Sequence, residues 1–137
     1  SIHQQKGITF ELDMAAKIEA ELDEEALVKI IVNLMDNATK YCESFVKVEI
    51  QRVADDALNF RILFINDGLP VPEHLRKKIF EPFYRVKKEV YKQGTGIGLA
   101  LSQSLAALLN GGLKFEVSKN GYNVFILTLP LKQCYHE

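Results

Sequence analysis

The sequence predicts an α+β domain in which helices cover one face of a mixed, mostly antiparallel sheet. Two observations support this class. Alternating apolar residues mark two hairpins, one in each half of the chain, and apolar residues at helical spacing mark three helices around them. The length of 137 residues suits one domain with a single hydrophobic core.

The first part of the chain contains two short candidate strands and then a long helix. Residues 8–12 and 17–22 have strand character. Asp23 is a good N-cap, and the acidic residues that follow it favour the positive end of the helix dipole. The apolar stripe of this helix comprises Leu27, Ile30, Ile31, Leu34, Met35 and Ala38.

The rest of the chain contains two hairpins and two further helices. Residues 45–53 and 58–65 alternate in polarity around a turn at Asp55-Asp56, which predicts the first hairpin. The loop NDGLPVP follows. The remaining predicted elements are a short helix over 72–79, a lysine-rich loop over 86–94, a helix over 96–109 that ends at Asn110-Gly111-Gly112, and a hairpin over 113–118 and 123–129.

The composition excludes several classes of protein. Apolar residues make up 47% and charged residues 26%, as in ordinary globular domains, and the net charge of −1 leaves no basic excess for nucleic acid. No apolar run approaches the length of a membrane span. Cys42 and Cys134 lie far apart and predict free thiols in a reducing compartment. We therefore expect no nucleic-acid partner and no direct membrane contact.

A polar row lies on the flank of the apolar stripe of the first helix. At about 100° per residue, Asn33, Asn37 and Lys40 fall on one side of it. Asparagine is a poor residue for a helix interior, so this row has two interpretations. It forms a solvated face, or its amide oxygens hold a hard cation such as Mg²⁺ while Lys40 faces phosphate oxygens.

A glycine-rich stretch, GTGIGLAL, opens the predicted helix over residues 96–109. Gly94, Gly96 and Gly98 stand at alternate positions, where a phosphate can approach backbone N–H groups at the positive end of a helix. The spacing differs from the dinucleotide-binding and P-loop patterns. A tight turn is the alternative interpretation.

Two further stretches offer candidate site residues. NDGLPVP, residues 66–72, consists of turn-forming residues and needs no functional reason to form a turn. In IFEPFYR, residues 79–85, the aromatic residues are either anchors for the loop that follows or ordinary core. These aromatic residues are Phe80, Phe83 and Tyr84. Arg85 ends the stretch as a candidate phosphate partner.

The order of these stretches resembles the catalytic ATP-binding domain of sensor histidine kinases, which has the Bergerat fold of the GHKL superfamily. NLMDNATKY, NDGLPVP, IFEPFYR, GTGIGLAL and GGLKFEVS match its N, G1, F, G2 and G3 boxes, within residues 7–131. The resemblance implies a two-layer α/β sandwich, with ATP between the helices and under a flexible lid. It also implies that residues 1–6 are a linker from a missing dimerisation domain and that residues 7–137 are the catalytic domain.

The resemblance implies roles for individual residues. Asn37 would ligate Mg²⁺ with Asn33 as a helper. Lys40 would contact phosphate, Tyr41 would lie near the ribose or base, and Arg85 would reach the γ-phosphate. The full implied set for ATP and Mg²⁺ is Asn33, Asn37, Lys40, Tyr41, Asn66, Asp67, Gly68, Val71, Pro72, Phe83, Arg85, Gly94, Thr95, Gly96, Ile97, Gly98, Leu99 and Asn123.

Position 33 also separates branches of the superfamily. Gyrase-type ATPases have a glutamate there, which acts as the base that activates water. Asn33 cannot accept a proton, so fast ATP hydrolysis is not expected. The resemblance also implies that Asn33 and Arg85 act as catalytic residues in phosphoryl transfer.

Three positions depart from the family pattern. Asn66 replaces the aspartate that accepts a hydrogen bond from the adenine amino group, Pro70 replaces a glycine, and Asn123 replaces a threonine. The amide oxygen of Asn66 can accept that bond, and its NH₂ group can donate to a ring nitrogen or a water. Asp67 is the alternative acceptor. Neighbours in a strand point to opposite faces, however, and the spacing to Gly68 favours Asn66.

The resemblance also implies partners that lie outside this chain. The family's phosphoacceptor is a histidine on a separate dimerisation domain, so His3, His74 and His136 are expected to be surface residues. A homodimeric parent, a response-regulator receiver domain and a cytoplasmic location within a membrane-bound bacterial sensor are implied as well. Two rival interpretations stay open: a degenerate regulatory module that binds no nucleotide, and an anti-sigma-factor-type serine kinase.

Overall fold

The computed structural model describes residues 7–14, 17–82 and 98–132. Its elements in chain order are β1 (Thr9–Met14), α2 (Glu24–Tyr41), β2 (Phe45–Val53), β3 (Asp56–Asn66), the 3-10 turns η1 (Glu73–Leu75) and η2 (Lys78–Phe80), α3 (Gly98–Leu108), β4 (Gly112–Val117) and β5 (Asn123–Pro130). The predictions for residues 83–97, including the flexible lid, lie outside the described residues.

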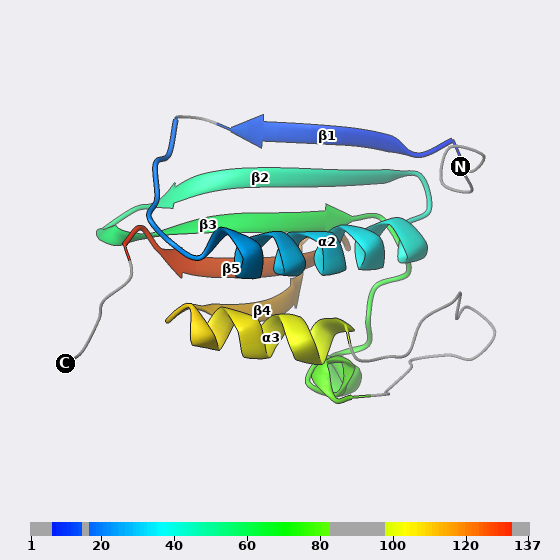
Figure 1. Cartoon of the computed structure of the whole chain (residues 1–137). Coiled ribbons are helices and arrows are strands. Elements are labelled where there is room, and N and C mark those ends of the chain that lie inside the picture. Colours follow the sequence, from blue (N-terminus) through cyan, green and yellow to red (C-terminus); the bar gives the residue numbers. More distant parts are fainter. Residues whose placement is uncertain (1–6, 15–16, 83–97, 133–137) are drawn as a thin grey trace.

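The five strands form one mixed sheet in the order β1-β2-β3-β5-β4. β1 runs parallel to β2, and the other three pairings are antiparallel. α2 and α3 lie side by side against one face of the sheet (Figure 1). The α+β class and the two-layer arrangement are therefore confirmed.

The segment over residues 17–22 is not the strand that its alternation predicts. The Glu21 N–H donates to the Leu131 carbonyl at 2.7 Å, and the only pairing of this segment is one isolated bridge. Ile18 and Leu22 nevertheless pack against the core. Their alternation reflects burial of one face, which does not require a neighbouring strand.

The short helix predicted over residues 72–79 and the first hairpin turn differ in detail from the prediction. The segment over residues 72–79 forms η1 and η2, because so short a segment makes too few hydrogen bonds to offset the cost of nucleating an α-helix. Ile79 is nevertheless buried there, and Phe80 packs against the core. The turn between β2 and β3 lies at Ala54-Asp55, one residue early, and Asp55 takes the left-handed conformation (φ 65°) that tight hairpin turns need.

The core lies between the sheet and the helices. α2 buries Ile30, Leu34 and Ala38 completely, and the predicted apolar stripe is confirmed. Full burial of one large apolar side chain stabilises the fold by about 1.5–3 kcal/mol. The start of α2 is fixed as predicted, because the Asp23 carboxylate accepts a hydrogen bond from the Ala26 N–H at 3.2 Å.

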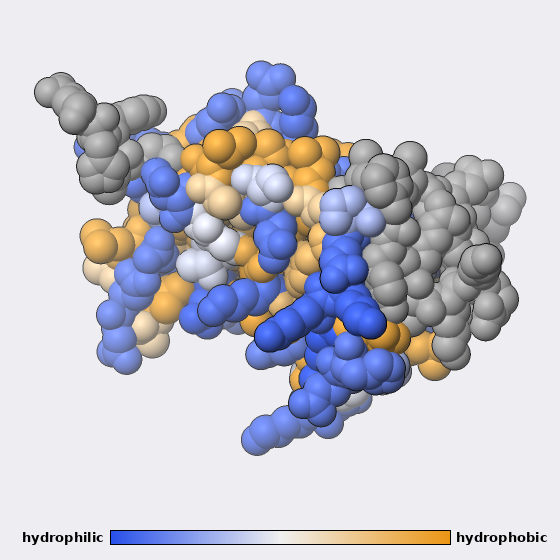
Figure 2. All heavy atoms as spheres, turned by 90° about the horizontal axis from the view of Figure 1, so that it is seen from below, coloured by the Kyte–Doolittle hydropathy of each residue, from blue (hydrophilic) through white to orange (hydrophobic). Residues whose placement is uncertain are grey.

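The surface of α3 is unusually apolar for a helix at the edge of a domain. It carries no charged residue, and Leu101 and Leu108 are 46% and 76% exposed. In the view from below, a hydrophobic band crosses the upper part of the described surface (Figure 2). None of the helices in the described residues is long and apolar enough to cross a membrane.

Candidate functional site

The predicted polar row lies in the C-terminal half of α2. Asn33 and Asn37 are half-buried, between the exposed and the core faces of the helix. The Lys40 ammonium pairs with the Asp36 carboxylate at 2.9 Å, and the Lys40 side chain is 24% exposed. The row is thus neither core nor fully solvated. Asp36 was missed by the sequence analysis, although its spacing of four residues to Lys40 is a signal for such a pair.

The loop after β3 packs tightly against the C-terminal end of α2. A Cβ atom at Gly68 would lie 2.1 Å from the Tyr41 carbonyl oxygen, so only glycine allows this approach. The Tyr41 residue is 37% exposed. The close approach holds the loop beside the end of the helix that carries the polar row.

Two buried asparagines connect this loop to the sheet. Asn66 ends β3, Asn123 begins β5, and the two are register partners with exposed fractions of 1% and 4%. Asn66 Oδ1 accepts from the Gly68 N–H at 2.9 Å and from Asn123 Nδ2 at 3.3 Å. Asn123 Oδ1 accepts from the Val71 N–H at 3.1 Å. Its Nδ2 also lies 3.0 Å from the Leu69 carbonyl oxygen, so the two side chains together fix the course of the loop.

Asp67 points away from Asn66, toward the connection between α2 and β2. Its carboxylate accepts from the N–H groups of Glu43, Ser44 and Phe45 at 2.9–3.0 Å, and from the Ser44 hydroxyl. Burial acts to raise its pKa, but the bonds from the Ser44 hydroxyl and the three N–H groups outweigh burial and lower the pKa of Asp67 to about 2. Ser44 was missed by the sequence analysis, because the two residues lie 23 positions apart.

The other predicted site residues divide between the described and the undescribed parts of the chain. The Val71 carbonyl accepts from Arg76 Nε at 3.2 Å, and Pro72 precedes η1 as its N-cap. Gly98 begins α3, and Leu99 packs against the core. Outside the described residues lie Phe83, Arg85, Gly94, Thr95, Gly96 and Ile97.

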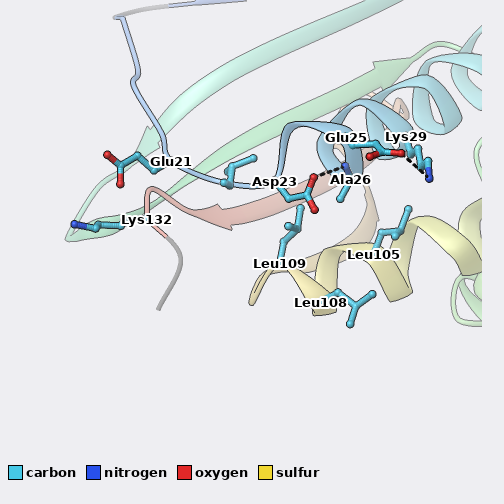
Figure 3. Close-up of a pocket in the computed structure, with 10 residues that line it drawn as sticks. Glu21, Asp23, Glu25, Ala26, Lys29, Leu105, Leu108, Leu109 and Lys132 are labelled. Carbon is cyan, nitrogen blue, oxygen red and sulfur yellow. Dashed lines mark hydrogen bonds and ion pairs between the residues drawn. The ribbon is translucent and has the colours of Figure 1, made fainter. Parts of the chain in front are cut away.

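A hollow of about 810 Å³ lies at the opposite end of the helix layer, between the start of α2 and the end of α3 (Figure 3). Its apolar lining consists of Leu105, Leu108 and Leu109. Charged residues also line it, and among them Glu25 and Lys29 form an ion pair at 3.6 Å. None of the predicted site residues lines this hollow.

The chain matches the model of a family described as histidine kinase-, DNA gyrase B- and HSP90-like ATPases, over residues 22–133. It therefore belongs to this family. Similar curated proteins include sensor histidine kinase TmoS of Ectopseudomonas mendocina, 31% identical over 132 residues, and adaptive-response sensory kinase SasA of Rippkaea orientalis, 30% identical over 131 residues. Each alignment covers 95% of this chain but only 14% and 34% of the relative, so the chain spans about a third of those proteins or less.

Solved structures show which members of this family resemble the chain in fold. The catalytic domain of histidine kinase ThkA, in a nucleotide-free form, aligns with a TM-score of 0.78 and 26% identity, over 94% of this chain and 84% of that one. The mycobacterial sensor histidine kinase MprB shares the fold with a TM-score of 0.80 and 21% identity, over 97% and 89% of the two chains. The sensor-histidine-kinase catalytic domain that the order of motifs predicts is confirmed.

Proposed function

We propose that this chain binds Mg-ATP where the loop after β3 meets the end of α2, and presents its γ-phosphate to a histidine on a separate dimerisation domain. The observation that carries the proposal is the fixed loop, with Gly68 against Tyr41 and with Asn66 and Asn123 beneath it. Phosphoryl transfer depends mainly on positioning, which requires rigid walls around the nucleotide. Family membership supports ATP as the substrate.

Asn33 and Asn37 fit a magnesium ion by their chemistry. Both offer amide oxygens, which are hard ligands, from half-buried positions one turn apart on α2. Magnesium keeps several waters and takes oxygens from substrate phosphates, so one or two protein ligands are enough. When bound, the ion supplies positive charge that offsets the charge of the phosphates.

Lys40, Arg85 and the glycine-rich loop supply the phosphate contacts in this proposal. Lys40 would exchange the Asp36 carboxylate for a phosphate oxygen. Residues 94–99 would offer backbone N–H groups at the start of α3, and Arg85 would face the γ-phosphate. Because Asn33 cannot accept a proton, transfer to a histidine is favoured over hydrolysis by water.

The partners in this proposal belong to a longer protein. Residues 1–6 would lead from the dimerisation domain that carries the acceptor histidine, and a response-regulator receiver domain would take the phosphoryl group from it. In that longer protein, this domain would lie in the cytoplasm. A solved complex of histidine kinase ThkA with response regulator protein TrrA has the same fold in its kinase, with a TM-score of 0.74 and 23% identity.

Calorimetry with ADP and magnesium tests the nucleotide site. We expect binding between micromolar and millimolar strength, and Asn37→Ala should weaken it about tenfold by removing a ligand oxygen. The same variant should keep its melting temperature, because Asn37 is half-buried and alanine is the better helix former. No heat and no thermal shift at millimolar nucleotide would favour the degenerate rival, which the departures at Asn66 and Pro70 motivate.

Labelling from radioactive ATP tests the transfer step. The isolated chain should stay unlabelled, and adding the parent's dimerisation domain should give acid-labile label on the histidine of that domain. Acid-stable label on the isolated chain would contradict this proposal and point to a serine kinase. His136 precedes Glu137 in this sequence, so His136→Ala is the control for any acid-labile label on the isolated chain.

A further inference from the structure

Within the described part of the chain, the polar side chains at the loop after β3 leave one hydrogen-bond donor without a partner. Asn66 Oδ1 accepts from two donors, Asn123 Oδ1 accepts from the Val71 N–H, and both oxygens of Asp67 accept from the connection between α2 and β2. The Asn66 NH₂ group, in contrast, has no partner among the described residues. Since buried polar groups are normally paired, this donor calls for an acceptor from outside the described fold.

The backbone fixes the orientation of the Asn66 amide. The Gly68 N–H can only donate, so the side-chain atom 2.9 Å from it is the oxygen. The Asn123 amide is fixed in the same way, because its oxygen meets the Val71 N–H and its NH₂ group meets the Leu69 carbonyl. Turning either amide over would bring two donors or two acceptors together. The NH₂ group is therefore the part of Asn66 that is left for a ligand.

The Asn66 side chain lies in a nearly closed environment, because only 1% of the residue is exposed. A ligand that presents a hydrogen-bond acceptor to this NH₂ group is favoured. A ligand that presents a second donor there should bind about tenfold more weakly, or weaker still.

We propose that this site reads position 6 of a purine with an NH₂ donor and so accepts 6-oxopurine nucleotides at least as well as adenine nucleotides. The inference rests on the proposed function, and it takes the purine base to lie against Asn66. Guanine presents the O6 acceptor at this position, whereas adenine presents an amino donor. Asp67 does not restore an adenine-type acceptor, because its carboxylate is held by Ser44 and its neighbours.

Calorimetric titration of the 137-residue chain with Mg-ADP and Mg-IDP tests the inference. Hypoxanthine carries the oxygen at position 6 without the additional 2-amino group of guanine, so IDP and ADP differ only at position 6 and at the neighbouring N1, which bears a proton in hypoxanthine. We expect IDP to bind the wild-type chain at least as tightly as ADP. Asn66→Asp replaces the donor by an acceptor and keeps the oxygen that Gly68 and Asn123 use, so it should shift the preference about tenfold toward ADP.

Asn120→Asp is the matched control. It adds the same negative charge at an exposed position in the turn between β4 and β5 and should leave the preference unchanged. Wild-type binding of ADP more than about threefold tighter than IDP, or an unchanged ratio in Asn66→Asp, would overturn the inference and leave the proposed function standing. If neither nucleotide binds the wild type or Asn66→Asp while both melt cooperatively, the inference and the proposed function fail together.

Discussion

The two ends of the helix layer use polar residues in different ways. At the end of β3, Asn66, Asp67 and Asn123 bond to backbone groups of the loop and of the connection between α2 and β2. At the other end, a hollow with leucine walls has charged residues around it, and the Glu25 and Lys29 side chains of its ion pair are 83% and 60% exposed. Exposed pairs contribute only about 0–1 kcal/mol. A dense network of hydrogen bonds to backbone groups therefore marks the candidate site more clearly than concavity does.

The largest expected effect comes from removing the close approach at the end of β3. Gly68→Ala should lower the free energy of unfolding by about 3 kcal/mol or more, because its Cβ atom would lie 2.1 Å from the Tyr41 carbonyl oxygen. Gly112→Ala is the control, since nothing lies within 4 Å of a Cβ atom there. Urea denaturation measures both. Equal stability of the two variants would show that the loop is not anchored as described.

Asp67→Ala should come next, with a loss of about 1–2 kcal/mol once solvent screening of the carboxylate is taken into account. The folded pKa of Asp67, about 2, lies below the ordinary value of 3.8. Its contribution is therefore complete above the ordinary pKa and disappears as the pH falls toward 2. The stability difference between wild type and variant should shrink between pH 5 and pH 2, roughly, in denaturant titrations. A constant difference would contradict the assigned hydrogen bonds.

Asn66→Ala and Asp67→Ala separate the two neighbours by nucleotide affinity. Asn66→Ala should lower ADP affinity by about tenfold, because it removes the acceptor of the Gly68 N–H and so loosens the loop that lines the proposed site. Asp67→Ala should largely spare affinity, because its carboxylate bonds to the connection between α2 and β2. Calorimetry of both variants decides. If only Asp67→Ala abolishes binding, the assignment of the loop is wrong by one residue.

The smallest effect is expected at the opposite end of the layer. Leu108→Ser, at a position 76% exposed beside the hollow, should change stability by no more than about 0.5 kcal/mol and leave nucleotide affinity unchanged. Thermal melting with and without Mg-ADP provides both measurements. A loss of affinity in this variant would show that the hollow, rather than the polar network, belongs to the site.

Patterns local in sequence predicted much of this molecule. Spacing and turn chemistry predict the apolar stripe of α2, its cap at Asp23 and both hairpins. These features are enough to define the α+β fold class. The strand predicted over residues 17–22 was wrong, because alternating apolar residues indicate one buried face and do not require a hydrogen-bonded neighbouring strand.

Contacts between distant residues were out of reach of such patterns. Asn66 and Asn123 lie 57 positions apart, and Asp67 and Ser44 lie 23 apart, so their pairing depends on the register of β3 and β5 and on the α2–β2 connection. Resemblance to the family predicted Asn66 as a site residue. Only the fold revealed that its oxygen is already used, because that depends on two partners brought together by the sheet.

The placement of β1 has a consequence for how the molecule opens. Among the described strands, β1 lies at the edge of the sheet, pairs only with β2, and has six exposed residues, whereas β3 is enclosed between β2 and β5. Strands with few buried contacts detach at a lower free energy than the global unfolding free energy. Deuterium exchange should therefore reach the amides of β1 first and those of β3 last, while the antiparallel strands and both helices stay closed during the early exchange.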